Sequence, residues 1–186
     1  MTKLNSFIIN KFLENDYSTL EIQSSSIFRN NSKGISKHAI ENIERFLDLG
    51  ITPVLYGDVV LDDEITFSIL SGDEIIYILC KNLITYKVSK AIFATDIEGI
   101  YVRGDKKNYV VSRISSDEID NLQLADMGTK IDVTEGIRGK LKQIKRIAQL
   151  GIPIEILNGI KPKFILKSLK NEKIESTYIE PSHGGV

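Results

Sequence analysis

Residues 92–101 read IFATDIEGIY, and this stretch decides how the chain folds. The apolar run Ala91–Ala94 predicts a buried strand that leads directly into the polar pair Thr95 and Asp96 and then into a glycine-containing turn. The turn ends at Tyr101, a residue that we expect to be exposed. In open α/β sheets, ligands bind at the carboxyl ends of the strands, where polar loops gather. The stretch therefore makes Asp96 a candidate ligand-binding residue.

On the N-terminal side of this stretch, apolar spacing and turn residues predict helices and strands in alternation. Ser36 is the expected N-cap of one helix, and Gly50 is the expected residue just beyond its end. The predicted elements are a helix over residues 4–13, a strand over 19–22, a polar loop over 29–34, a helix over 36–49, a strand over 51–56, a hairpin pairing 59–61 with 65–67, and a helix from 71 to about 83.

The C-terminal side continues the same alternation. The predicted elements are strands over residues 90–94 and 109–114, a helix over 138–150 ended by Gly151, a strand over 152–157, a helix over 163–169 and a strand over 177–179. Strands that alternate with helices of this length indicate βαβ units. The sequence therefore predicts an α/β fold, with a mostly parallel sheet covered on both faces.

Composition narrows the class of protein. The 186 residues include 24 Lys and Arg against 25 Asp and Glu, and this balance gives no reason to expect a nucleic-acid partner. The single cysteine, Cys80, allows no disulfide within the chain and favours a reducing, cytoplasmic location. No apolar run approaches the roughly 18 residues of a membrane span. We expect one domain over residues 1–186, with two small lobes as the alternative, and no membrane partner.

Four polar loops are expected at the same rim of the sheet, because the carboxyl end of each strand joins the amino end of the next helix. They are residues 56–58, 71–73, 95–101 and 132–140. In the second loop, Ser71 and Glu74 have the spacing of a capping box that closes a helix N-terminus. This capping does not use Asp73, whose carboxylate either complements the helix dipole or has a function of its own.

The fourth loop, DVTEGIRGK, gives a more specific indication of an anion-binding site. If the helix begins near Arg138, Lys140 lies in its first turn, where a cation is disfavoured unless an anion binds there. Thr134, Gly136 and Gly139 would offer a hydroxyl and accessible amides to phosphate oxygens. The alternative is a solvated basic helix, and the spacing is not that of a P-loop.

Plainer interpretations remain for the other candidates. Asp96 could cap a turn, Tyr101 could cover a sheet edge, and Gly57 could be a turn glycine. His38 is expected at an exposed position early in a helix, and His183 in a disordered C-terminal tail.

Read together, five motifs resemble those of the amino acid kinase superfamily. They are YGDV at 56–59, SGDE at 71–74, ATDIEGIY at 94–101, DVTEGIRGKL at 132–141 and ILNG at 156–159. Within the superfamily, their order and spacing look most like those of isopentenyl phosphate kinases. The resemblance implies an αβα sandwich, transfer of the ATP γ-phosphoryl group to isopentenyl phosphate with Mg²⁺, and a homodimer.

The same resemblance implies roles for individual residues. Asp73 would organise the catalytic lysines, and Lys140 would stabilise charge on the transferring phosphoryl group. The residues implied in ATP binding are Thr95, Asp96, Tyr101, Gly136 and Lys140. Gly57 would lie beside the phosphate acceptor. Such roles suit phosphoryl transfer, which depends mainly on positioning and electrostatic stabilisation.

The chain also departs from the family pattern. The opening strand with its Lys-x-Gly-Gly-Ser loop and the Gly-Gly-Gly-Ser-Phe-Gly-His segment are absent, and Glu135 stands where glycine is common. If the chain were complete, the sheet would lack central strands, and we would expect self-association and little activity. The alternatives are a uridylate-type kinase of the same superfamily, a nucleotide-binding subunit without catalysis, and an α/β domain whose loops are only capped turns.

Overall fold

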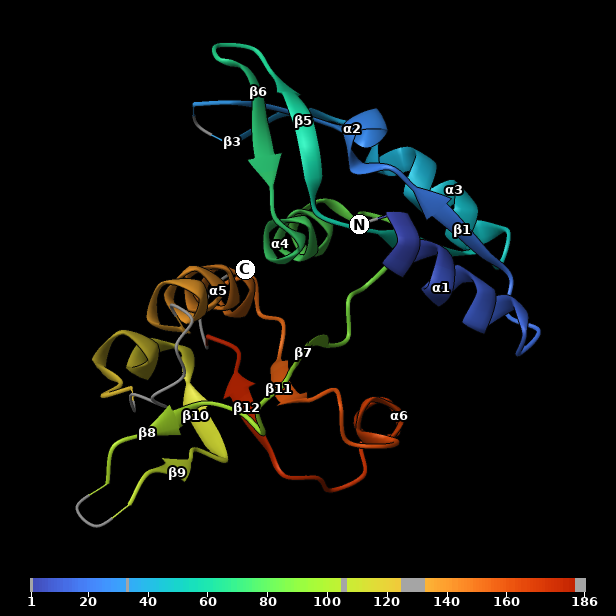
Figure 1. Ribbon diagram of the computed structural model, residues 1–186. Helices are drawn as coiled ribbons and strands as arrows, with labels where there is room; N and C mark the ends of the chain where they lie inside the picture. Colours follow the sequence, from blue (N-terminus) through green and yellow to red (C-terminus); the bar gives the residue numbers. More distant parts are fainter. Residues whose placement is uncertain (1, 33, 105–106, 125–132, 183–186) are drawn as a thin grey trace. The chain divides into compact units, whose positions relative to one another are not determined.

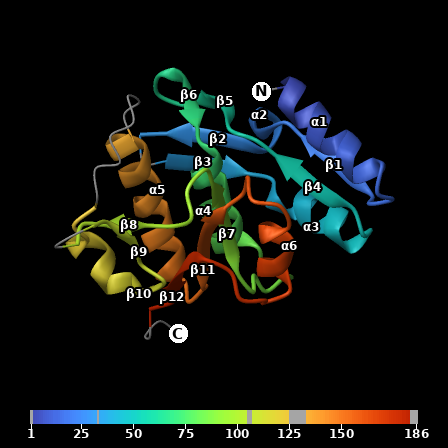
Figure 2. The ribbon, with the colours of Figure 1, turned by 60° about the horizontal axis from the view of Figure 1, so that its bottom comes forward.

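The computed structural model describes residues 2–32, 34–104, 107–124 and 133–182, and only the backbone of Thr2 and of residues 133–138. These residues form two compact units, 1–87 and 88–186, which are described separately below. Figures 1 and 2 show the helices and strands of each unit. Within the described residues, none of the helices is both long and apolar enough to cross a membrane.

Unit 1 is built from short strands with helices packed against them. Its elements are α1 (Thr2–Leu13), β1 (Thr19–Ile22), α2 (Ser24–Ile27), β2 (Phe28–Asn31), β3 (Gly34–His38), α3 (Ile40–Asp48), β4 (Thr52–Leu55), β5 (Asp58–Asp62), β6 (Thr66–Leu70) and α4 (Gly72–Asn82). Strands β1 and β4 pair in parallel, and a second sheet has the order β3-β2-β5-β6.

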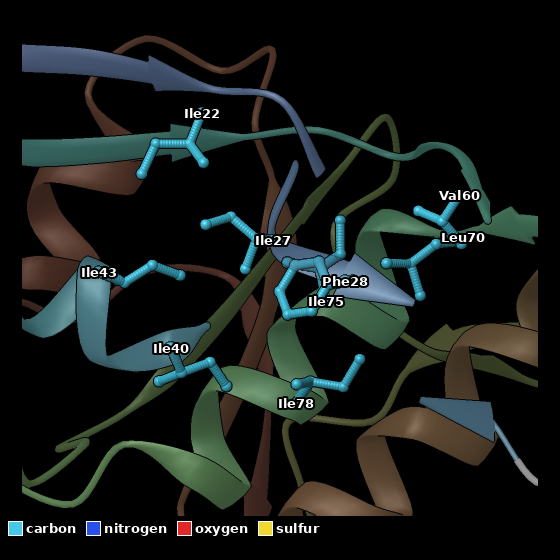
Figure 3. Packing of buried hydrophobic residues seen from close by; sticks show 9 residues of the cluster. All are labelled: Ile22, Ile27, Phe28, Ile40, Ile43, Val60, Leu70, Ile75 and Ile78. Atoms are coloured by element: carbon cyan, nitrogen blue, oxygen red, sulfur yellow. The ribbon is translucent and has the colours of Figure 1, made fainter. Parts of the chain in front are cut away.

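The core of unit 1 is a cluster of isoleucines and other apolar side chains from nearly all of these elements (Figure 3). Ile40 and Ile43 lie three residues apart on α3 and are 2% and 1% exposed, so they form one buried helix face. Opposite them, Val60 of β5 and Leu70 of β6 point inward. Burial of each such side chain stabilises the fold by about 1.5–3 kcal/mol.

Unit 2 contains a four-stranded sheet of order β10-β12-β11-β7 and a small hairpin, β8-β9. Its elements are β7 (Ala91–Thr95), β8 (Tyr101–Val102), β9 (Tyr109–Val110), β10 (Arg113–Ser115), the 3₁₀ helix η1 (Ser116–Asn121), α5 (Val133–Ala148), β11 (Ile154–Asn158), α6 (Phe164–Leu169) and β12 (Ser176–Glu180). Strand β11 is parallel to β7 and antiparallel to β12.

Strand β11 lies at the centre of this sheet, and all five of its residues are buried. Helices α5 and α6 both pack against β11, and Figures 1 and 2 show them on opposite sides of it. The inward face of α5 is made by Leu141, Ile144, Ile147 and Ala148, as the sequence predicted. The α/β fold is therefore confirmed, and each of the two four-stranded sheets combines parallel with antiparallel pairs.

The N-terminal third departs from the sequence-based prediction. Residues 29–34, expected to be a loop, belong largely to the antiparallel pair β2–β3, and Ser36 lies on β3 instead of capping a helix. Its Oγ lies 2.8 Å from Oδ2 of Asp63 in the turn between β5 and β6. Strand pairing and this polar contact outweigh the weak strand propensity of the segment. Helix α3 consequently begins later, with Ala39 as its N-cap.

Several other predicted boundaries hold. The hairpin that turns at Asp62 is confirmed, with Asp62 Oδ1 accepting hydrogen bonds from the amides of Glu64 (2.9 Å) and Ile65 (3.2 Å). Its pairing differs from the prediction, because residues 59–61 of β5 pair with residues 67–69 of β6 instead of 65–67. Gly50 and Gly151 follow α3 and α5 with φ of +71° and +78°, a conformation that favours glycine. The strand predicted over 109–114 is instead divided into β9 and β10.

Candidate functional site

Gly57 lies in close backbone contact with the segment that begins α4. A Cβ atom at this position would lie 3.0 Å from the carbonyl oxygen of Leu70 and 3.1 Å from the nitrogen of Gly72. Both distances are tighter than nine in ten real Cβ contacts, and the neighbours are backbone atoms that cannot easily move. Unit 1 therefore brings two predicted site segments together, Gly57 and residues 71–73.

Ser71 fixes the start of α4 and with it the position of Asp73. Its Oγ accepts a hydrogen bond from the amide of Glu74 at 3.1 Å, which confirms the predicted N-cap. Asp73 is the second residue of α4 and is partly buried. A carboxylate here is favoured by the positive end of the helix dipole. This geometry presents Asp73 from a rigid helix start.

In unit 2, Thr95 is the last residue of β7, and Asp96 follows it into the loop of residues 95–101, as predicted. The Thr95 hydroxyl donates to the carbonyl of Ile97 at 2.9 Å and accepts from the Ile97 amide at 3.3 Å, so it closes a local turn. The side chain of Asp96 is exposed, while its backbone carbonyl accepts from Nδ2 of Asn158 at 3.2 Å. The backbone of Asp96 is thus fixed, and its carboxylate faces solvent.

Tyr101 is not exposed as expected but half-buried at the start of β8. Its hydroxyl donates to Oε2 of Glu98 at 2.8 Å. This hydrogen bond, followed by burial, raises the pKa of Tyr101. The phenol is therefore held as a neutral donor to a carboxylate of its own loop. The sequence prediction missed this because it treated Glu98 as a spacer within the motif.

Lys140 does not lie in the first turn of a helix, as the sequence had suggested. Helix α5 begins at Val133, so Lys140 is its eighth residue, and the dipole argument no longer applies. Interior glycines cost a helix only about 1 kcal/mol each, so Gly136 and Gly139 need not end it. The Lys140 Nζ lies 5.4 Å from the ring centroid of Phe93 on β7, close enough for a cation–π contact.

The remaining candidates of this segment are only partly described. Thr134, Glu135 and Gly136 belong to the part of α5 of which only the backbone is described. Asp132 and His183 lie outside the described residues. His38 is exposed as expected, but it ends β3 instead of starting a helix. Among the described residues there is no group of three or more His, Cys, Asp or Glu side chains that could hold a metal ion.

Three residues to which the sequence assigned no role of their own shape this part of unit 2. Asn158 joins the turn after β11 to the 95–101 loop, and its Oδ1 accepts from the amide of Ile160 at 2.9 Å. Thr177 of β12 is fully buried, and its Oγ1 accepts from the amide of Ile100 at 2.8 Å. Lys161 forms an ion pair with Glu98 at 2.8 Å. Only Asn158 carried a signal, since Asn-Gly after a strand is typical of a turn.

The sequence profile of the Amino acid kinase family matches residues 1–158, most of the chain. The chain therefore belongs to the amino acid kinase family. Within it, the chain is similar to isopentenyl phosphate kinases. It is 33% identical to the one from Methanothermobacter thermautotrophicus, over 97% of this chain and 68% of the relative. It is 30% identical to the one from Methanocaldococcus jannaschii, over 97% of this chain and 65% of the relative.

Comparison with a solved structure also shows similarity to an isopentenyl phosphate kinase. The fold matches an isopentenyl phosphate kinase crystal structure with a TM-score of 0.74 and 28% identity, over 96% of this chain and 66% of the other. The resemblance inferred from the five motifs is thus confirmed, together with the fold that it implied. The chain spans about two thirds of the length of these relatives.

Proposed function

We propose that the protein is an ATP-dependent phosphotransferase that phosphorylates isopentenyl phosphate to isopentenyl diphosphate, a step of isoprenoid synthesis. The observation that carries this proposal is the similarity to isopentenyl phosphate kinases along 97% of the chain. In the reaction, the bond between the γ-phosphorus and the oxygen bridging it to the β-phosphate breaks. A phosphate oxygen of the acceptor forms the new bond, and ADP leaves.

The described residues support separate roles on the two sides of this reaction. On the acceptor side, Gly57 would lie beside the substrate, and its lack of a Cβ atom lets the backbone at the start of α4 come close, where Asp73 would orient the cationic groups. On the nucleotide side, Thr95, Asp96 and Tyr101 would hold ATP through their loop. Phosphoryl transfer requires little covalent chemistry from the protein, so positioning of this kind is its main contribution.

Lys140 would stabilise the charge that develops on the transferring phosphoryl group. This role is supported by the contact of the Lys140 ammonium with buried Phe93, because Phe93 belongs to the strand that leads into the 95–101 loop. Gly136, one turn earlier on α5, would allow the backbone to approach the ATP phosphates. Mg²⁺ would neutralise phosphate charge, held mainly by ATP oxygens and water, as is common where this ion binds nucleotides.

The test uses the protein expressed from its full coding sequence, with ATP, Mg²⁺ and isopentenyl phosphate. We expect ATP-dependent formation of isopentenyl diphosphate. In Lys140→Ala, kcat should fall about 10²- to 10³-fold, the usual cost of removing one group that stabilises transition-state charge. Asp73→Asn should also lose activity. The matched controls are Lys142→Ala, an exposed neighbour on α5, and Asp117→Asn, an exposed aspartate of η1.

Two outcomes would contradict the proposal. ATP binding without phosphoryl transfer to any phosphate acceptor would favour a non-catalytic nucleotide-binding subunit. Turnover of uridylate in preference to isopentenyl phosphate would favour a uridylate-type kinase. Activity in Lys140→Ala equal to that of Lys142→Ala would remove Lys140 from the mechanism while leaving the reaction itself standing.

The proposal includes a homodimer in the cytoplasm. The family resemblance supports the dimer, and α1 exposes apolar side chains that a partner could cover, Leu4 at 61% and Phe7 at 58%. The single cysteine supports a reducing compartment, and burial raises the pKa of the Cys80 thiol to about 11, which keeps it protonated and unreactive. Sedimentation equilibrium should give twice the chain mass, and a monomer at micromolar concentration would contradict the dimer.

A further inference from the structure

Glu98 has a partner on each of its carboxylate oxygens. The hydroxyl of Tyr101 donates to Oε2 at 2.8 Å, and Nζ of Lys161 lies 2.8 Å from Oε1. The side chain of Glu98 is only 21% exposed, although it belongs to a loop. The hydrogen bond from Lys161, followed by that from Tyr101, lowers its pKa to about 2. The Glu98 carboxylate is therefore charged at neutral pH, and it joins its own loop to Lys161.

Lys161 comes from the neighbouring turn, residues 158–161, between β11 and α6. Because β7 and β11 are parallel neighbours with Thr95 opposite Asn158, the 95–101 loop and this turn leave the sheet at the same edge. The amide of Gly159 donates to the Thr95 carbonyl at 2.8 Å, which ties the backbones of loop and turn at their base. The Glu98–Lys161 ion pair ties them a second time, three residues further along the loop than Thr95.

Lys161 is itself held in place from several directions. Its Nζ lies 3.4 Å from Oε2 of Glu175 and 5.3 Å from the ring centroid of Phe164. The residue after it is Pro162, which restricts the backbone of Lys161 to extended conformations. The ammonium is thus presented to Glu98 from a constrained turn.

A partly exposed ion pair of this kind contributes little to global stability. Its effect should be local, because it strengthens the link between two segments that are also joined by the amide of Gly159 and by Nδ2 of Asn158, which lies 3.2 Å from the Asp96 carbonyl oxygen and 3.4 Å from Oε1 of Glu98. The exposed carboxylate of Asp96 lies within the loop that is fixed in this way. Ordering such a loop before a ligand arrives removes an entropic cost from binding.

We propose that Glu98 and Lys161 are positioning residues for the nucleotide: their ion pair holds the 95–101 loop against the 158–161 turn in the conformation that binds ATP. This inference rests on the proposed function, in which the loop binds ATP. Neither residue needs to touch the reacting atoms. Loss of the pair should therefore weaken ATP binding and leave the chemical step unchanged.

The test compares Lys161→Met with Lys161→Arg, in which a longer cation can still reach Glu98, and with Lys173→Met, the same substitution at an exposed lysine. In the full protein, Lys161→Met should raise both KM and Kd for ATP roughly tenfold, while kcat stays within about twofold. Lys161→Arg should restore most of the affinity. Lys173→Met should match the unmodified protein.

A second readout needs neither substrate nor catalysis. Without nucleotide, amide hydrogen exchange of residues 96–100 should be faster in Lys161→Met than in Lys173→Met, whereas exchange in β11 should be unchanged. Unchanged exchange and unchanged ATP affinity in Lys161→Met would overturn the inference even if the kinase reaction is confirmed. A fall in kcat with KM unaltered would overturn it as well, by giving Lys161 a direct catalytic role.

Failure of the proposed function would look different. An unmodified protein that binds ATP but transfers no phosphate would refute the kinase proposal, and the exchange and Kd measurements would still confirm or refute the positioning role. An unmodified protein that binds no ATP would overturn both proposals together.

Discussion

The hydroxyl of Thr177 accepts a hydrogen bond from the amide of Ile100 at 2.8 Å, between two residues that are both 0% exposed. The same hydroxyl donates to the carbonyl of Val111 at 2.6 Å. One side chain of β12 therefore satisfies a buried amide of the 95–101 loop and a carbonyl of the segment after β9. It holds the loop at Ile100, while Asn158 and Lys161 hold it at Asp96 and Glu98.

Thr177→Val should be destabilising, because it keeps the shape of the side chain but leaves the buried amide of Ile100 without a partner. A buried unsatisfied donor costs about 1–3 kcal/mol. Thr177→Ser keeps the hydroxyl and loses one methyl group, for a cost of about 1 kcal/mol. Urea unfolding of the two variants checks the order. Equal stability of the valine and serine variants would show that the hydrogen bond contributes nothing.

Gly99→Ala should be destabilising for a steric reason at the same contact. A Cβ atom on Gly99 would lie 2.4 Å from Oγ1 and 2.9 Å from the backbone nitrogen of Thr177. Overpacking of this kind costs about 1–3 kcal/mol. Gly139→Ala is the control, since a Cβ there meets nothing within 4 Å and the residue lies inside α5. It should stabilise the protein by about 0.5–1 kcal/mol. Thermal unfolding should move in opposite directions for the two variants.

The sequence was most informative where local chemistry decides local structure. Asp62 was predicted to begin a turn, and its carboxylate does accept the two amides that close it. The prediction failed at Ser36, whose local pattern suits a helix cap but whose strand is set by pairing with β2 and contact with Asp63. That contact joins residues 27 positions apart, so no local pattern contains it.

The residues of the candidate site also fall into two groups, those that a local motif locates and those that it does not. Thr95, Asp96 and Tyr101 could be located from one motif, because the loop is continuous in sequence. The residues that hold this loop could not, because Lys161 and Thr177 come from later elements and have no motif of their own. The helix start predicted near Arg138 was wrong, since α5 begins at Val133 and its interior glycines cost only about 1 kcal/mol each.

The buried ion pair of Lys90 and Glu155 should be important for the stability of unit 2. Lys90 Nζ donates to Oε2 of Glu155 at 3.0 Å, and the two side chains are 14% and 11% exposed. Burial alone would raise the pKa of Glu155, but hydrogen bonds from Ser168, Ser176 and Lys90 hold it below its usual value. The carboxylate therefore stays charged and needs its cation.

Lys90→Met should cost about 3–5 kcal/mol, the usual penalty for leaving one buried charge without its partner. The double variant Lys90→Met with Glu155→Gln should recover part of that loss, since the orphaned charge is removed. A double-mutant cycle by urea unfolding measures the coupling. Additive effects of the two substitutions would show that the pair is not coupled in the folded protein.

Ser71→Ala should weaken the start of α4. The hydrogen bond from the Glu74 amide to Ser71 Oγ at 3.1 Å would be lost, and N-cap substitutions of this type cost about 1 kcal/mol. Ser71→Asp should keep most of the stability, because aspartate is an equally good N-cap. Chemical denaturation gives the comparison, and an alanine variant as stable as the aspartate variant would argue against the cap.

Glu98 should titrate far below an ordinary glutamate. Its pKa is lowered from 4.5 to about 2, first by the hydrogen bond from Lys161 and then by that from Tyr101. Because the folded-state pKa lies below the unfolded value, the contribution of this group to stability is present above pH 4.5. It is lost as the pH falls from there towards 2. An NMR titration of the Glu98 side-chain carboxyl carbon should therefore show a midpoint near 2, and Lys161→Met should move that midpoint up towards 4.5. A midpoint near 4.5 in the unmodified protein would mean that Lys161 does not hold the loop in solution.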